Sequence, residues 1–239
     1  RGNRLCIYTL QIKLSNSGIY AVFFILLAGF GIYFEICACI TSKQSLTTML
    51  QFATDDSSRH TVGEQVSLAL NAGCRWIRVT GNPSEDTIRS LIAPCKKNDT
   101  ILVLDNDINL VDRLRIHGLH LTEWTRGSLI EARKNLGPHA IIGVSCSNPA
   151  LLGEFAGLDI DYLVAYAPAG QNQEDFYINF MECLRSAGSE IHPVAGGPIP
   201  VSLFPAILAT GIEGFELPGN VADAPDSSAF IQLAMQSLG

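Results

Sequence analysis

The segment from Ile101 to Ser145 limits the possible folds of this chain more than any other part. Within it, three short apolar runs alternate with two segments whose apolar residues recur at the helical period. Buried strands that alternate with helices indicate a parallel sheet, because parallel strands need a crossover connection between them. The runs are Ile101–Leu104, Gly118–Leu121 and Ile141–Val144, and the helical segments are Ile108–Leu114 and Leu129–Leu136.

From Met49 onward the same strand-and-helix pattern recurs eight times with short loops, which predicts a small (β/α)8 TIM barrel. An open doubly wound sheet is the alternative, but it has a glycine-rich first turn, and here only Thr54-Asp55-Asp56 follows the first strand. The other expected strands are Leu50–Ala53, Trp76–Thr80, Tyr162–Tyr166, His192–Ala195 and Gly214–Leu217. The other expected helices are Val62–Ala72, one from Ser84, one from Asn148-Pro149, Phe176–Ala187, Val201–Thr210 and Ser227–Leu238.

The first 48 residues form a hydrophobic N-terminal segment ahead of the barrel, which we place at residues 49–239. Residues 14–34 carry no charge and are long enough to span a bilayer. Since Met49 is the first methionine, the segment is also readable as an extension upstream of the natural start. The sequence therefore leaves two interpretations open, a single membrane anchor and an extension that the fold does not need.

The overall charge and the cysteines narrow the range of partners. The net charge of −7 argues against nucleic acid as a partner. Binding to phosphate backbones needs clustered Lys and Arg residues, and the sequence has no such cluster. The seven cysteines form no C-x-x-C pair, so they predict neither a metal site nor a redox motif. We expect a reducing, cytoplasmic location, with the N-terminal membrane anchor as the alternative.

Polar residues follow the strands of the opening segment. In parallel α/β folds the carboxyl ends of the strands meet at one face, where ligands bind. Asp105, Asn106 and Glu123 are the candidate ligands of a Mg²⁺ ion there, because this ion prefers oxygen ligands. The competing interpretation is a set of helix caps, in which Asp107 caps the helix that starts at Ile108.

Two glycine turns follow the seventh and eighth strands. Gly196 and Gly197 end the seventh, and Gly219 and Asn220 follow the eighth. Barrels frequently bind phosphate with backbone N–H groups of these two loops, because glycine lets the backbone approach an anion closely. The sequence therefore predicts phosphate binding at these four residues.

Two further polar residues are candidates for catalysis. Ser145, at the end of the fifth strand, can donate a hydrogen bond to a substrate. Arg78, within the second strand, is a candidate partner for an anion if it points into the barrel. His120 lies between apolar neighbours, which favours a packed core histidine over a catalytic base.

Three runs, Ala69–Ile77, Gly118–Leu121 and Glu131–Ser145, resemble thiamine phosphate synthase and the related thiazole tautomerases. The resemblance covers Met49 to the C-terminus. It implies a (β/α)8 barrel that joins hydroxymethylpyrimidine diphosphate to a thiazole phosphate with release of pyrophosphate. It also implies phosphorylated small molecules as partners and Mg²⁺ as the cofactor that stabilises the leaving group.

Several residues that the family pattern would supply are replaced. Its second strand ends in glutamine-x-arginine-x-lysine, where this chain offers Arg78, Thr80 and Asn82. Thr125 stands where the family has a second metal-binding aspartate. The loop over residues 167–175 lacks the family's lysine.

Losing one preorganised charged donor costs about 10²–10³ in rate, so the resemblance implies a degenerate active site and an impaired synthase. The alternative is a non-catalytic paralogue that binds a phosphorylated ligand or a protein partner.

Overall fold

The computed structural model describes residues 7–14, 19–28, 31–35, 49–188 and 190–238. The chain divides into two compact units, Arg1–Ser45 and Leu46–Gly239. The described strands of the first unit form an antiparallel sheet in the order β1-β2-β3. Their bounds are Ile7–Leu14, Ile19–Ala28 and Gly31–Glu35.

The candidate membrane anchor at residues 14–34 falls partly on these strands and partly, at 15–18 and 29–30, outside the described residues. No helix in the described ranges combines the length and the apolar character needed to cross a membrane. The role of this segment stays a prediction.

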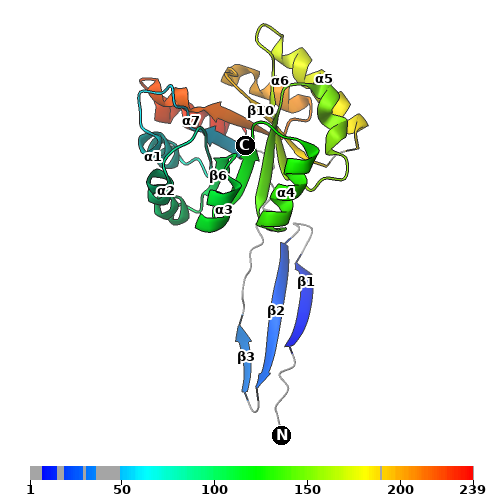
Figure 1. The fold of residues 1–239 in the computed structure, drawn as a ribbon. Helices are drawn as coiled ribbons and strands as arrows, with labels where there is room; N and C mark the ends of the chain where they lie inside the picture. The colour runs from blue at the N-terminus through cyan, green and yellow to red at the C-terminus, as the bar shows by residue number, and fades with distance from the viewer. Residues whose placement is uncertain (1–6, 15–18, 29–30, 36–48, 189, 239) are drawn as a thin grey trace. The chain divides into compact units, whose positions relative to one another are not determined.

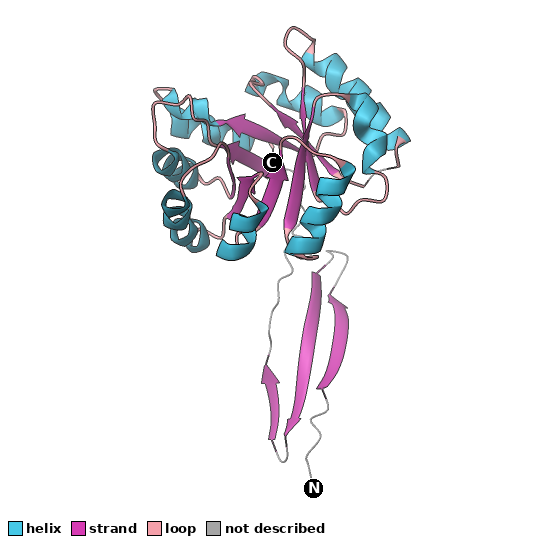
Figure 2. Cartoon of the chain, in the orientation of Figure 1, coloured by secondary structure: helices cyan, strands magenta, loops and turns pink. Residues whose placement is uncertain are grey.

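In the second unit, eight parallel strands close into a barrel in the order β10-β11-β4-β5-β6-β7-β8-β9, with the helices outside them (Figures 1 and 2). The predicted TIM barrel is confirmed. The strands are β4 (Met49–Ala53), β5 (Trp76–Val79), β6 (Ile101–Asp105), β7 (Gly118–Leu121), β8 (Ile141–Cys146), β9 (Tyr162–Tyr166), β10 (His192–Gly196) and β11 (Gly214–Pro218).

The helices follow the predicted order, with three differences. The helix expected after Asn148-Pro149 is a 3-10 helix, η1 (Pro149–Phe155), in a segment that contains Gly153, a residue that disfavours the α-helix. The helix expected at Val201–Thr210 divides into a 3-10 helix and a short α-helix, and a further 3-10 helix follows β11 where none was predicted. The remaining helices are α1 (Val62–Ala72), α2 (Glu85–Lys97), α3 (Ile108–Leu114), α4 (Arg126–Leu136), α5 (Gln173–Ser186), η2 (Val201–Leu203), α6 (Phe204–Ala209), η3 (Gly219–Asp223) and α7 (Ser227–Gln236).

Local capping explains where the first helices begin. Thr61 and Glu64 form a capping box at the start of α1, and Gly73 ends that helix in the left-handed conformation. The Ser84 side chain accepts a hydrogen bond at the start of α2. Asp107 accepts one from the Leu110 N–H, so the predicted cap of α3 is confirmed.

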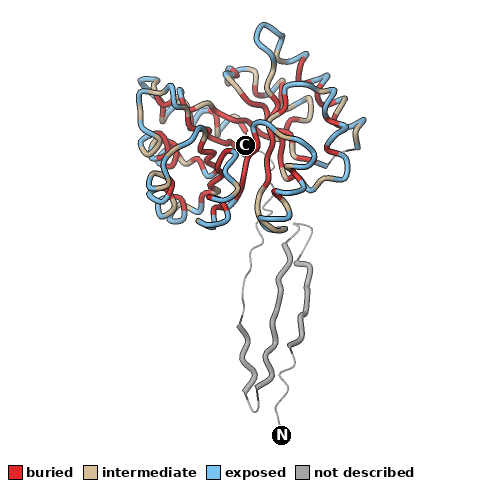
Figure 3. Tube along the Cα trace, in the orientation of Figure 1, coloured by how far each residue is buried: buried red, intermediate tan, exposed pale blue. Residues whose placement is uncertain are grey.

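Buried apolar residues form two clusters, a large one that joins strands and helices and a smaller one inside the barrel. In Figure 3 the buried parts of the trace follow the barrel strands. Inside the barrel the packing requires Gly143, because a Cβ atom there would lie 2.1 Å from the Tyr162 ring. The smaller cluster contains Trp76, Val103, Tyr162, Val164 and Val194, and it forms an apolar floor. The polar residues described next lie nearer the carboxyl ends of the strands, which we call the barrel mouth.

Candidate active site

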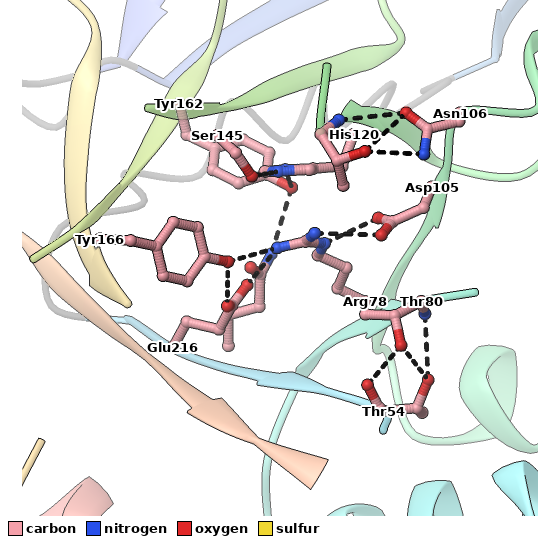
Figure 4. A network of polar contacts seen from close by, with 12 residues as sticks. Thr54, Arg78, Thr80, Asp105, Asn106, His120, Ser145, Tyr162, Tyr166 and Glu216 are labelled. Carbon is pink, nitrogen blue, oxygen red and sulfur yellow. Dashed lines mark hydrogen bonds and ion pairs between the residues drawn. The ribbon is translucent and has the colours of Figure 1, made fainter. Parts of the chain in front are cut away.

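A buried arginine connects three strands at the barrel mouth. Arg78 on β5 donates two hydrogen bonds to Asp105 on β6, from Nε to Oδ1 at 2.7 Å and from Nη2 to Oδ2 at 3.0 Å. Its Nη1 donates to Glu216 Oε2 on β11 at 2.7 Å and to the Tyr166 hydroxyl on β9 at 2.8 Å (Figure 4). Arg78 therefore points into the lumen, where both of its carboxylate partners belong to the protein itself.

Glu216 is held by further donors. The Tyr166 hydroxyl donates to Oε1 at 2.5 Å. In the orientation that satisfies its neighbours, the Gln51 amide nitrogen donates to Oε2 at 2.7 Å and its oxygen accepts from the Trp76 indole at 2.8 Å. These contacts fix the carboxylate against Arg78 and leave it 5% exposed.

The three ionisable groups influence one another strongly. Burial opposes the charge on Arg78, but Glu216 and Asp105 outweigh it and hold its pKa well above the ordinary value. Burial raises the pKa of Asp105, although Arg78 acts in the opposite direction. The cluster therefore joins one guanidinium to two carboxyl groups, Asp105 and Glu216.

A second chain of contacts connects His120 to Ser145. His120 is fully buried on β7, its Nδ1 lies 2.9 Å from the Tyr162 hydroxyl, and its Nε2 lies 2.8 Å from the Ser145 Oγ. Burial, assisted by the positive charge of Arg78, holds the pKa of His120 well below its ordinary value. The imidazole is therefore neutral near pH 7 and orients the Ser145 hydroxyl, which is partly buried at the mouth.

The candidate metal residues do not fit Mg²⁺ as they are arranged. Both oxygens of Asp105 accept from Arg78. The Asn106 oxygen accepts from the Thr122 N–H at 3.0 Å, and Glu123 is exposed. Among the described residues, no three His, Cys, Asp or Glu side chains gather in a way that could hold a metal ion. The side-chain oxygens of Asp105 and Asn106 are therefore already used by neighbouring donors.

The candidate phosphate residues lie on neighbouring strands. β10 and β11 pair in parallel with Gly196 opposite Glu216, so the loops that follow them leave the barrel side by side. Gly197 has a φ of +103°, which favours glycine. A Cβ on Gly219 would lie 2.4 Å from the Asp55 nitrogen, whereas Asn220 is exposed. Phosphate binding at these loops stays a prediction.

Two threonines stand where the resemblance noted above implies charged residues, and both have structural contacts. The Thr80 N–H donates to Thr54 Oγ1 at 3.0 Å, which ties the loops after β5 and β4 together. Thr125 caps helix α4 by accepting from the Ser128 N–H. The Thr80 hydroxyl also donates to the Thr54 carbonyl oxygen, so both side chains stabilise the loops at the mouth.

Sequence reasoning missed Glu216 and Tyr166. The available signal was a single acid within the apolar strand Gly214–Pro218. The position of Tyr166 at a strand end gave no comparable signal, because an aromatic residue is common in a buried strand.

Comparison with known families identifies this barrel. The family model described as thiamine monophosphate synthase matches residues 50–217, most of the chain. The chain belongs to the thiamine monophosphate synthase family. The resemblance read from the sequence is thereby confirmed at the level of the family.

This chain matches two relatives named thiamine-phosphate synthase over nearly the whole length of each relative. The protein from Bacteroides thetaiotaomicron is 30% identical over 194 residues, which span 75% of this chain and 92% of that relative. The protein from Bacteroides fragilis is 29% identical over 191 residues, which span 74% and 93%.

Solved structures agree on the fold of this family member. Thiamine phosphate pyrophosphorylase from Pyrococcus furiosus superposes with a TM-score of 0.66 at 19% identity, over 80% of this chain and 95% of the other. A 3-hexulose-6-phosphate synthase superposes with a TM-score of 0.61 at 17% identity, over 80% and 100%. At these identities the similarity establishes the barrel and not the reaction.

Proposed function

We propose that this chain is an impaired synthase of thiamine biosynthesis that joins hydroxymethylpyrimidine diphosphate to a thiazole phosphate. In this reaction a C–N bond forms at the pyrimidine methylene group while the C–O bond to pyrophosphate breaks. Membership of the family and the names of the two Bacteroides relatives support the reaction class.

The proposal that this synthase is slow rests on one observation, the pairing of Arg78 with Asp105 and Glu216. A departing diphosphate is stabilised by cationic groups that are free to contact it. Arg78 is a cation in the lumen, and its hydrogen bonds are directed to two protein carboxylates and to the Tyr166 hydroxyl. Losing one such donor costs about 10²–10³ in rate.

Other residues at the mouth can still position substrates. We assign the phosphate of the thiazole substrate to backbone N–H groups of Gly197 and Gly219, beside β10 and β11. The Ser145 hydroxyl, oriented by His120, donates a hydrogen bond to the substrate in the lumen. These roles need no residue that the chain lacks.

The test is product formation by the full chain. The purified protein is incubated with both substrates and Mg²⁺, and thiamine phosphate is measured by mass spectrometry against a control without protein. We expect product that accumulates slowly and in proportion to protein concentration. Failure to exceed the control at high protein concentration would contradict synthase activity.

A non-catalytic paralogue that binds a phosphorylated ligand is the second candidate. The same internal pairing of Arg78 favours it, because a mouth that satisfies its own charges can bind without reacting. Ligand binding raises the unfolding temperature, so thermal unfolding with thiamine phosphate or pyrophosphate tests it. Stabilisation without Mg²⁺ and without turnover supports this candidate, and no stabilisation by either compound contradicts it.

A further inference from the structure

Trp124 connects the segment after β7 to the end of β8. Its indole Nε1–H donates to the backbone carbonyl of Ser145 at 2.9 Å. The pairing of β7 with β8 ends at Leu121 opposite Val144, one residue before Ser145. A strand carbonyl beyond the paired register needs another donor, and an indole N–H can only donate. The Trp124 side chain therefore holds this strand end where the neighbouring strand has stopped.

A second contact fixes the orientation of the indole. The Trp124 ring packs on Phe155 at the end of η1, with ring centroids 4.3 Å apart and planes inclined by 41°. Phe155 is buried in the core. The next residue, Thr125, caps α4 by accepting a hydrogen bond from the Ser128 N–H. The ring of Trp124 and the backbone beside it are therefore both fixed, although the side chain is only half-buried.

The strand end that Trp124 holds carries a side chain of the candidate site. The Ser145 Oγ lies 2.8 Å from His120 Nε2 (Figure 4). One ring thus contacts the backbone of Ser145 and another contacts its hydroxyl. Hydrogen bonds weaken steeply when their distance or angle changes, so a shift of the β8 end would disturb the contact with His120.

We propose that Trp124 is a positioning residue, which fixes the end of β8 so that the Ser145 hydroxyl stays beside His120 and faces the substrate. The role toward the substrate rests on the proposed function, in which Ser145 donates a hydrogen bond to it. Trp124 acts through Ser145 and needs no contact with the substrate. Reaction rates are sensitive to displacements of about 1 Å, so a residue that only fixes geometry affects the rate.

Nitrogen-15 NMR of His120 reads the position of Ser145 without any need for turnover. The full chain is labelled at its 5 histidines, and the His120 signals are identified by their loss in His120→Gln. Ser145→Ala gives the Nε2 shift that belongs to a missing hydroxyl. Trp124→Phe keeps an aromatic ring for the contact with Phe155 and removes the indole N–H.

Arg126→Met is the matched control. Arg126 donates to the backbone carbonyls of Glu154 and Ala156 at the end of η1. Its loss therefore weakens the same neighbourhood and leaves the contacts of Ser145 in place.

We expect Trp124→Phe to move the His120 Nε2 shift in the same direction as Ser145→Ala, and Arg126→Met to keep the wild-type value. A folded Trp124→Phe with the wild-type shift would overturn the proposal. A wild-type shift in Ser145→Ala would also overturn it, because the imidazole would then not contact the hydroxyl.

Hydrogen exchange in the wild-type chain keeps the proposal testable if Trp124→Phe does not fold. An N–H group held in a stable hydrogen bond exchanges slowly with solvent deuterium. We expect the Trp124 indole N–H to exchange about tenfold or more slowly than that of free tryptophan. Exchange as fast as in free tryptophan would contradict the contact with Ser145.

Turnover separates the proposal from the function on which it rests. Where wild type forms thiamine phosphate, Trp124→Phe should form it about threefold to tenfold more slowly, the effect of one lost hydrogen bond, and Arg126→Met at the wild-type rate. Equal rates of wild type and Trp124→Phe would contradict the role toward the substrate. If wild type forms no product, the synthase function fails, and the His120 shift alone decides whether Trp124 positions Ser145.

Discussion

At the scale of single residues, Arg78 has the largest effect on the barrel mouth. Its hydrogen bonds provide partners for two buried carboxylates, Asp105 and Glu216, which are 6% and 5% exposed. A buried ion pair adds little net stability compared with an apolar replacement of all partners, but removing one partner leaves uncompensated charge. Arg78 therefore matters both for the charge of the mouth and for the stability of the fold.

The first prediction follows from this pairing. Arg78→Met should lower the free energy of unfolding by about 3–5 kcal/mol, because two buried carboxylates lose their cation. The matched control is Arg113→Met, which removes an arginine whose ion pair with Glu85 is 60% exposed on the arginine side. The control should change stability by about 0.5 kcal/mol or less. Urea denaturation measures both, and equal losses would contradict the account.

The second prediction concerns His120 and acid. Its folded-state pKa lies well below the ordinary 6.5 because the ring is buried. Below about pH 6.5 the unfolded chain therefore binds more protons than the folded chain, so stability falls as the pH is lowered. His117, whose pKa is also lowered by burial, contributes in the same direction.

Comparison with His120→Gln isolates the contribution of His120. The unfolding temperature of wild type should drop between about pH 7 and pH 5, and the variant should show a smaller drop. Thermal unfolding followed by circular dichroism gives both slopes. Identical slopes would show that His120 does not take up a proton on unfolding.

At the scale of elements, β8 has to leave room inside the barrel for a side chain from β9. Gly143 faces the Tyr162 ring, and Tyr162 in turn supports His120 through its hydroxyl. The third prediction is that Gly143→Ala costs about 1–3 kcal/mol or more, because the added methyl group overlaps the ring. Gly153→Ala in η1, where no atom lies within 4 Å of the new Cβ, is the control. Equal stability of the two variants in urea denaturation would contradict this packing.

The same scale shows what the sequence could predict. Helices α1 and α3 and strands β7 and β9 have the predicted bounds. Both helices begin at a side-chain cap, and both strands are short runs of buried residues. The 3-10 helix η1 was expected only as a helix, because the Asn148 cap and Pro149 mark where a helix begins and not its type.

The site was harder to predict than the elements. Arg78 and Ser145 were recognised as candidates because polar residues within buried strands stand out. Asp105 was also a candidate, but as a metal ligand and not as the partner of Arg78. Glu216 was missed, because its pairing depends on the closed order of the strands, which places β11 two positions from β5. Glu216 could therefore not be assigned to Arg78 before the barrel was known.

At the scale of the whole molecule, the acidic balance of the chain extends into its barrel mouth. The chain has a net charge of −7, and the described cluster around Arg78 joins one guanidinium to two carboxyl groups. The family fold is retained, and in our proposal the cation that would serve a diphosphate is paired within the protein. The central claim is that this internal pairing limits the rate of the family reaction.

The turnover number of the full chain with saturating substrates and Mg²⁺ tests this claim most directly. Enzymes typically turn over about 10 times per second, and the loss of one charged donor costs about 10²–10³ in rate. The account therefore predicts a turnover number below about 0.1 s⁻¹. A value near 10 s⁻¹ would contradict it.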